Sequence, residues 1–237
     1  MKKYDLINKL EQFAPSTNAE PWDCVGFISE TTNQEITKIM LCLTPTNKVI
    51  SQAISQNCDM IISHHPMFYV DCSILTKNYT PLIDIFSMHT NLDKANGGTT
   101  DNLIKTLELN EYKTEFKHEF LRIVELKNSI TIENFTQKLL KISPNLRYVN
   151  NNSLKTLRKI AFCAGSGTDF IDEAKNLNCD CLVTGDLKFH AALDSEIILF
   201  DIGHFESEII ILPTIEQIIE KDIEIIYANE VNPFIYP

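Results

Sequence analysis

The chain has 237 residues, of which 44% are hydrophobic and 22% charged, the balance of a globular protein large enough to bury a core. Its net charge of −11 argues against a broad nucleic-acid surface, which needs clustered lysine and arginine. No apolar run approaches a membrane span, and the N-terminus lacks the apolar core of a signal peptide. Seven cysteines without a Cys-x-x-Cys pair indicate buried thiols in a reducing compartment. We therefore expect a cytoplasmic protein without a membrane or nucleic-acid partner.

The first elements along the chain are a helix and a strand–helix–strand unit. Leu6, Leu10 and Phe13 have the spacing of an amphipathic helix. The apolar runs 38–43 and 58–63 predict buried strands, and the segment between them has helical spacing. Near-continuous apolar strands joined through a helix are typical of a mostly parallel sheet covered by helices. The sequence therefore predicts an α/β fold.

A weak internal repeat relates this unit to a second one further along the chain. Residues 38–43 align with 159–164, and 57–59 align with 178–180 at the same offset. The second copy also reads as strand, loop, helix and strand, so we predict a second βαβ unit in a mostly parallel sheet.

Between the two copies, the run 120–126 predicts a strand, followed by a helix that Thr131 or Ser129 would cap. A short strand near 146–149 follows. The chain then ends in a predicted helix at 214–220 and a final strand at 223–227.

Two adjacent histidines, His64 and His65, end the apolar run 58–63. Successive side chains at a strand end point in roughly opposite directions, so the imidazoles could serve two metal ions, or one metal ion and one substrate group. The alternative is a pair of structural histidines with satisfied hydrogen bonds. The chain has six histidines, and the positions of the others bear on this choice.

Two further histidines are each followed by a carboxylate four positions later. His89 precedes Asp93 and His204 precedes Glu208, so each pair would share one helix face. Imidazole nitrogen and carboxylate oxygen are ligands that suit zinc, manganese or iron. The two pairs occupy corresponding places in the repeat, beyond the carboxyl ends of parallel strands, where ligands bind in α/β folds. Together with the histidine pair, they favour a metal site over a structural role.

These motifs resemble, in order and over nearly the whole length, the GTP cyclohydrolase 1 type 2 family, also called the Nif-three-like proteins. The matching elements are Pro21-Trp22-Asp23-Cys24-Val25-Gly26, Ile62-Ser63-His64-His65-Pro66-Met67-Phe68, His89-Thr90-Asn91-Leu92-Asp93, Gly97-Gly98-Thr99-Thr100-Asp101, Gly165-Ser166-Gly167, Thr184-Gly185-Asp186 and Gly203-His204-Phe205-Glu206-Ser207-Glu208. Cys24 departs from the family, which usually carries asparagine there.

The resemblance implies a site for two divalent metal ions. The family's ligands fall, by position, on His64, His65, Asp93, His204 and Glu208. Glu208 would bridge the two ions, and His89 would lie beside them as a further ligand or a proton shuttle.

The resemblance also implies two interlinked α/β lobes with mostly parallel mixed sheets. We place the first lobe at 1–112 plus 212–237 and the second at 113–211. The family further implies homohexamers whose metal ions face the interior.

The resemblance makes GTP the candidate small-molecule substrate. A metal-activated water would attack C8 of the purine, the imidazole ring would open, and formate would leave. His89 and His190 are the candidates for proton transfer. A metal-dependent phosphoesterase and a non-catalytic metal-binding scaffold or regulatory protein fit the same ligands.

Two of these motifs each have two possible roles. The backbone of Gly165-Ser166-Gly167 could hold a phosphate or form an ordinary strand-to-helix turn, which the incomplete glycine pattern favours. Trp22-Asp23 could form a turn beside the site, or Trp22 could be an ordinary aromatic anchor.

Overall fold

A computed structural model describes residues 1–67, 76–77, 80–117, 119–219 and 222–235. The chain divides into two compact units. The first unit comprises Met1–Asn96 and Ile211–Pro233, and the second comprises Gly97–Ile210 and Phe234–Pro237. The main segment of the second unit therefore lies, in the sequence, between the two segments of the first.

The first unit contains a five-stranded mixed sheet with the order β1-β6-β3-β2-β13. Its strands are β1 (Gly26–Ser29), β2 (Lys38–Cys42), β3 (Met60–Ser63), β6 (Asp84–Ser87) and β13 (Glu224–Tyr227). Strands β13, β2, β3 and β6 run parallel, and β1 pairs antiparallel with β6. A separate antiparallel pair is formed by β4 (Thr76–Lys77) and β5 (Thr80–Pro81). The predicted strands on both sides of the first helical crossover and at the C-terminus are confirmed.

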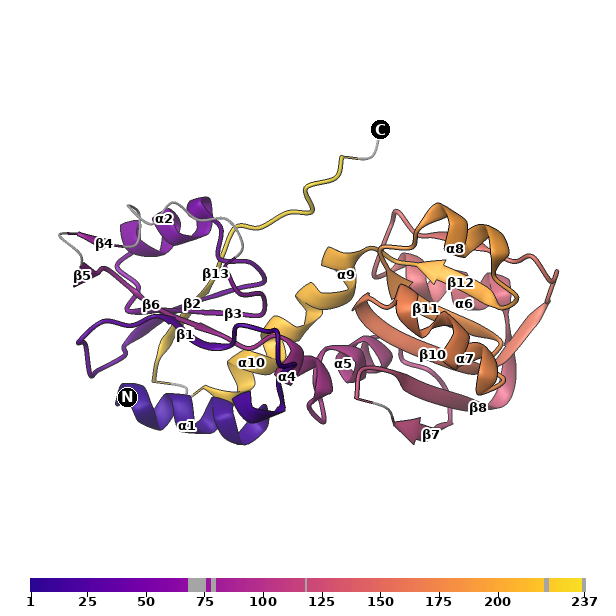
Figure 1. Ribbon diagram of the computed structural model, residues 1–237, viewed down its shortest axis with the longest axis horizontal. Coiled ribbons are helices and arrows are strands. Elements are labelled where there is room, and N and C mark those ends of the chain that lie inside the picture. Colours follow the sequence, from indigo (N-terminus) through magenta and orange to yellow (C-terminus); the bar gives the residue numbers. More distant parts are fainter. Residues whose placement is uncertain (68–75, 78–79, 118, 220–221, 236–237) are drawn as a thin grey trace. The chain divides into compact units, whose positions relative to one another are not determined.

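Helices cover both faces of this sheet, with α2 on one face and α1 and α10 on the other (Figure 1). The helices of the unit are α1 (Lys3–Phe13), α2 (Asn47–Ser55), α4 (Thr90–Lys94) and α10 (Leu212–Ile218). The predicted amphipathic helix is confirmed, because Leu6 and Leu10 of α1 are fully buried. Val49, Ile50 and Ala53 of α2 pack with alternate residues of β2 and β3 in one apolar cluster.

The second unit contains a six-stranded mixed sheet with the order β7-β8-β10-β11-β12-β9. Its strands are β7 (Tyr112–Lys117), β8 (Arg122–Thr131), β9 (Arg147–Val149), β10 (Thr156–Ser166), β11 (Cys181–Gly185) and β12 (Ile198–Asp201). Strands β10, β11 and β12 are parallel, whereas β7, β8 and β9 pair antiparallel with their neighbours. Both units thus have the α/β architecture with mixed sheets that the sequence predicts, although the second sheet is parallel only at its centre, where β10, β11 and β12 pair.

Helices also pack on both faces of the second sheet. They are α5 (Thr99–Thr106), α6 (Ile132–Leu140), α7 (Ile171–Asn176), α8 (Phe189–Asp194) and α9 (His204–Glu208). Helices α5 and α6 contribute to one apolar cluster, and α7 contributes to another. Thr131 caps α6 by accepting a hydrogen bond from the Asn134 N–H, which confirms one of its two predicted caps. No helix in the described ranges combines the length and apolar character needed to cross a membrane.

The internal repeat is visible in the backbone of both units. Asn57 and Asn178 each adopt a left-handed conformation with φ of 56° where a helix ends, a place that tolerates asparagine. Asp59 and Asp180 then each accept hydrogen bonds from two consecutive N–H groups near the N-terminal end of the preceding strand in the repeat, β2 or β10. The two copies therefore share a specific turn, in addition to a similar order of elements.

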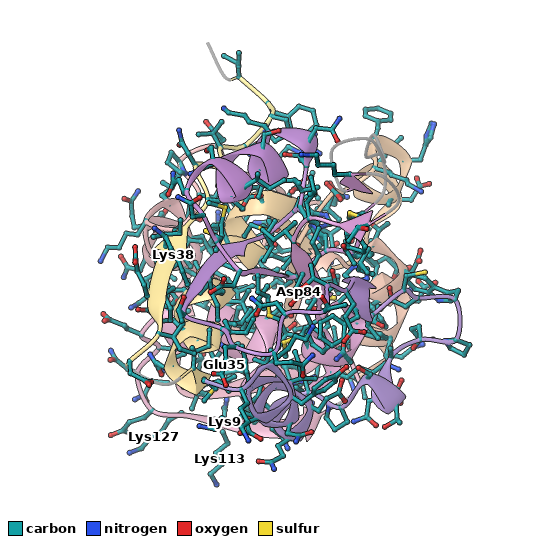
Figure 2. The ribbon with its side chains drawn as sticks, turned by 90° about the vertical axis from the view of Figure 1, so that its left-hand side faces the viewer. Lys9, Glu35, Lys38, Asp84, Lys113 and Lys127 are labelled. Atoms are coloured by element: carbon teal, nitrogen blue, oxygen red, sulfur yellow. The ribbon has the colours of Figure 1, made fainter. Side chains whose placement is uncertain are left out.

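A buried ion pair ties helix α1 to the first sheet. The ammonium of Lys3 lies 3.3 Å from the Asp84 carboxylate, and both side chains are fully buried. Lys3 also donates to the Thr31 carbonyl, and Asp84 accepts from the Thr31 N–H. In Figure 2, other side chains surround Asp84. Removing Asp84 would leave the buried Lys3 ammonium with only the partly exposed Glu30 carboxylate, 3.5 Å away, as its ionic partner, and would leave the Thr31 N–H without its acceptor.

We therefore expect Asp84→Ala to reduce the free energy of unfolding by about 3–5 kcal/mol. The matched control is Lys38→Ala, which breaks the pair between Lys38 and the exposed Glu224 at 2.8 Å and should cost about 0–1 kcal/mol. Urea unfolding followed by circular dichroism measures both. Equal costs for the two variants would show that the Lys3–Asp84 pair does not stabilise the first unit.

Candidate metal centre

In the first unit, three neighbouring parallel strands deliver the candidate groups to one edge of the sheet. His64 and His65 directly follow β3, Thr44 follows β2, and His89 follows β6. The hydroxyls of the strand-end serines, Ser63 and Ser87, lie 2.7 Å apart, and each lies within hydrogen-bond distance of the His65 carbonyl, at 2.8 and 3.1 Å. These bonds fix the backbone that carries the histidine pair.

The two adjacent imidazoles are held through their Nδ1 atoms. His64 is fully buried, and its Nδ1 lies 2.9 Å from the Met88 carbonyl oxygen. Because a carbonyl only accepts, Nδ1 must carry the proton, and Nε2 of the neutral ring then carries the lone pair that can bind a metal ion. His65 Nδ1 lies 2.8 Å from the Thr44 hydroxyl, so Nε2 of the same ring points away from Thr44.

A carboxylate holds the third imidazole. Asp23 Oδ1 lies 2.9 Å from His89 Nδ1, and the other carboxylate oxygen accepts from the N–H and the hydroxyl of Thr90. Although burial raises it, these bonds from Thr90 and His89 hold the pKa of the Asp23 carboxyl below its ordinary value. Asp23 is therefore an anion that fixes His89 with its proton on Nδ1.

The histidines of the first unit form a compact group of donors. One ring nitrogen from each of His64, His65 and His89 lies within 4.8 Å of the others. Asp93, in helix α4, adds a carboxylate oxygen 3.6 Å from His64 Nε2. We call these four residues the histidine cluster. The sequence pattern paired Asp93 with His89, but in the structure His89 turns to Asp23 and Asp93 lies against His64.

In the second unit, the strand ends of β10, β11 and β12 form a similar edge. His204 begins helix α9 after β12, and its Nε2 lies 3.0 Å from Glu208 one turn later. Its Nδ1 lies 2.7 Å from Asp186, which follows β11. Although burial disfavours the charged form, the hydrogen bonds and charges of Glu208 and Asp186 raise the pKa of His204 to about 9. A metal ion that binds Nε2 of His204 therefore displaces a proton from it.

Glycine makes room for the Glu208 carboxylate. Gly165 has φ of +67°, and a Cβ there would overlap the Glu208 carboxylate. Its N–H donates to the Ser207 hydroxyl, which in turn donates to the His204 carbonyl. The loop after β10 therefore packs directly against the helix that carries the candidate ligands.

The Gly165-Ser166-Gly167 segment is an ordinary strand-to-helix turn, as the sequence favours. Its two glycine N–H groups already bond to the hydroxyls of Ser207 and Thr184. They are engaged within the second unit and do not form a ready phosphate cradle.

His190 has different surroundings from the other candidates. It is exposed on helix α8, its ring contacts Phe189 edge-on, and it lines a cavity of about 490 Å³ with Asp172, Asp194 and Glu196. Neither His204 nor Glu208, the candidate ligands of the second unit, lines this cavity. A role for His190 in proton transfer stays a prediction.

The donors in both units fit a divalent metal ion. Imidazole nitrogens and carboxylate oxygens suit zinc, manganese and iron. Three of the four imidazoles bond through Nδ1 to a group that accepts, which is the arrangement that supports a histidine ligand through Nε2. The residues present therefore could bind metal, and the choice of ion stays open.

The supporting residues around the histidines were the part of the site that sequence reasoning missed. Asp23 and Asp186 each lie inside a motif that the sequence singles out, but the motif gave them no role. A carboxylate within reach of a candidate histidine was the available signal. The Met88 carbonyl and the Thr44 hydroxyl carried no signal, because their roles depend on the alignment of neighbouring strands.

Comparison with known proteins gives the family. The sequence matches the profile of Duf34/NIF3 (NGG1p interacting factor 3) over residues 1–233. The chain belongs to this family. It is 32% identical over 262 aligned positions to a protein of Clostridium perfringens, covering 99% of each chain. It is also 32% identical to a protein of Campylobacter jejuni, covering 100% of each. Both relatives carry the name GTP cyclohydrolase 1 type 2 homolog.

Solved structures share the fold over the full chain. A hypothetical protein from Staphylococcus aureus matches with a TM-score of 0.79 at 26% identity, covering 100% of this chain and 99% of that one. Reduced HcgD from Methanocaldococcus jannaschii matches with a TM-score of 0.80 at 24% identity, covering 97% and 98%. The predicted family resemblance and fold class are thus confirmed.

The close packing at Gly165 gives a test of the Glu208 position. We expect Gly165→Ala to shift the Glu208 carboxylate and to weaken metal binding by more than about tenfold, measured by competition with a chelating dye. Gly26→Ala is the matched control, because Gly26 also has positive φ (+86°) but its added Cβ would approach nothing closer than 4.0 Å. Both variants should lose about 1–2 kcal/mol to backbone strain. Unchanged metal affinity in Gly165→Ala would show that Glu208 does not bind metal from this position.

Proposed function

We propose that this chain is a dinuclear metal-dependent hydrolase whose candidate substrate is GTP. The observation that carries the proposal is the anchoring of His64, His89 and His204 through Nδ1 to groups that only accept hydrogen bonds. Structural histidines do not need this shared orientation, whereas metal-binding histidines do. The names of the relatives support a GTP cyclohydrolase-like reaction.

We propose a set of five metal ligands. The proposed set is His64, His65, Asp93, His204 and Glu208, with Glu208 as the bridging carboxylate. Two divalent ions held by such ligands would lower the pKa of water and stabilise negative charge that develops on the substrate. The donor chemistry of each unit and the family resemblance support this set.

The proposed reaction is hydrolytic opening of the purine imidazole ring. One water adds at C8 and the ring opens to a formamide, and a second water hydrolyses the formamide to release formate. These steps need a group that accepts and returns protons near neutral pH, for which imidazole is suited. We assign this role to His89 in preference to His190, because Asp23 holds the His89 ring in one orientation.

The wider expectations from the family are part of the same proposal. We propose a homohexamer, supported by the resemblance alone, and a cytoplasmic location. The location is supported by six free thiols among the described cysteines, five of them buried, since disulfides are rare in reducing compartments. Cys72 and His118 lie outside the described residues.

The ligand assignment predicts the metal content of single variants. We expect His64→Ala and Glu208→Gln to lose most of the metal that the wild-type protein holds, because each removes a donor that no neighbour replaces. Elemental analysis of the purified, desalted proteins measures this loss. Glu216→Gln is the control, since Glu216 bonds to Tyr227 on an exposed surface. Wild-type metal content in both ligand variants would refute the assignment.

The reaction predicts a specific product. Metal-loaded protein should release formate from GTP, and His89→Gln should lower kcat by about 10²–10⁴-fold while keeping its metal. Formate is measured with a coupled dehydrogenase and phosphate with a colorimetric assay. Release of phosphate without formate would identify a phosphoesterase instead. If the fully metal-loaded protein releases neither formate nor phosphate, the chain is a metal-binding scaffold or regulatory protein.

A further inference from the structure

The only tryptophan of the chain is exposed. Trp22 is 70% exposed, although tryptophan is among the side chains that are most buried on average. The alternative that Trp22 is an ordinary aromatic anchor is therefore wrong, because its indole is not packed into the core. A single exposed apolar side chain is ordinary by itself, so the significance of Trp22 depends on what holds and surrounds its indole.

The backbone that presents this indole is held firmly. The side chain of Asp23, the next residue, is almost fully buried, and its carboxylate accepts bonds from His89 Nδ1 and from two groups of Thr90. Its N–H donates to the Glu20 carbonyl in the turn before it, and the Glu20 N–H donates to the Thr90 hydroxyl. The segment is therefore tied to helix α4 on both sides of Trp22, while the indole projects outward.

The indole lies beside the histidine cluster. Its ring centre is 6.4 Å from that of His89, with the two planes at 77°. The rings of His64 and His65 lie 5.3 and 5.5 Å from His89. An exposed aromatic face thus lies next to the group of imidazoles that would bind metal.

We propose that the indole of Trp22 is the stacking surface for the planar aromatic heterocycle of the substrate. Indole is well suited because it offers a large, rigid π-face, and a stacked ring gains affinity without a specific hydrogen bond. Identifying the heterocycle as a purine rests on the proposed function. The stacking surface itself rests on the exposure of Trp22 and the anchoring of its backbone.

Two other exposed aromatic side chains, Phe189 and Tyr4, lack this combination. Phe189 is equally exposed, but it neighbours His190 on helix α8 and has no contact with a candidate ligand in the described parts of the chain. Tyr4 is half exposed and packs against Phe27. Of these three residues, only Trp22 is both exposed and in contact with the histidine cluster.

The single tryptophan provides its own reporter. We expect guanosine and GTP to quench the intrinsic fluorescence of the full chain excited at the red edge of indole absorption, whereas ribose 5-phosphate should leave it unchanged. Guanosine should also quench after chelator treatment, because stacking needs no metal ion. Absence of quenching by guanosine and GTP at saturating concentrations would overturn the proposal.

Kinetics give a second measurement. Trp22→Leu should raise the KM for GTP by about 5- to 150-fold and leave kcat within about twofold, whereas Trp22→Phe should keep most of the affinity. Both substitutions are at an exposed position, and thermal unfolding checks that the fold is retained. An unchanged KM in Trp22→Leu would overturn the stacking role.

The two proposals fail separately. Quenching by guanosine without formate release would support the stacking surface and refute the cyclohydrolase reaction. Formate release with the same KM in wild type and Trp22→Leu would support the reaction and refute the stacking surface.

Discussion

The parallel alignment of neighbouring strands is the constraint on which the candidate ligands of each unit depend. In the first unit, β2, β3 and β6 run in one direction, so the residues that follow them meet at a single edge. The same holds for β10, β11 and β12 in the second unit. Each strand contributes one or two polar groups at that edge. Burial of the continuous apolar runs before these groups offsets the free-energy cost of burying them.

Orientation of the imidazoles is a local property of each unit. The anchors of His64 and His89 are the Met88 carbonyl and Asp23, all within the first unit. The anchor of His204 is Asp186, within the second unit. Each unit therefore fixes the ring orientation of these three histidines, so the fold of that unit decides which nitrogen can take a metal ion.

Much of the fold could be predicted from the sequence because its signals are local. Apolar runs identify buried strands, helical spacing identifies α1 and α2, and the repeated Asn-Cys-Asp segments mark equivalent turns. The candidate ligands also followed from spacing and from position at strand ends. The supporting contacts could not be predicted, because Asp23 reaches His89 from a segment 66 positions away. The exposure of Trp22 was equally hidden, since an aromatic residue in a motif more often anchors a core.

The repeat also explains why the two halves carry different groups at equivalent places. His64-His65 ends the second strand of the first copy, and Gly185-Asp186 ends the second strand of the other. A Cβ at Gly185 would lie 2.8 Å from the His204 backbone nitrogen, so any side chain there would displace helix α9. The second copy therefore could not keep a histidine pair and also hold His204 where it is. Asp186 instead holds that histidine through Nδ1. The first copy thus presents two imidazoles directly from a strand end. The second copy has glycine at the equivalent position, which leaves room for helix α9 to present the imidazole of His204 and the carboxylate of Glu208.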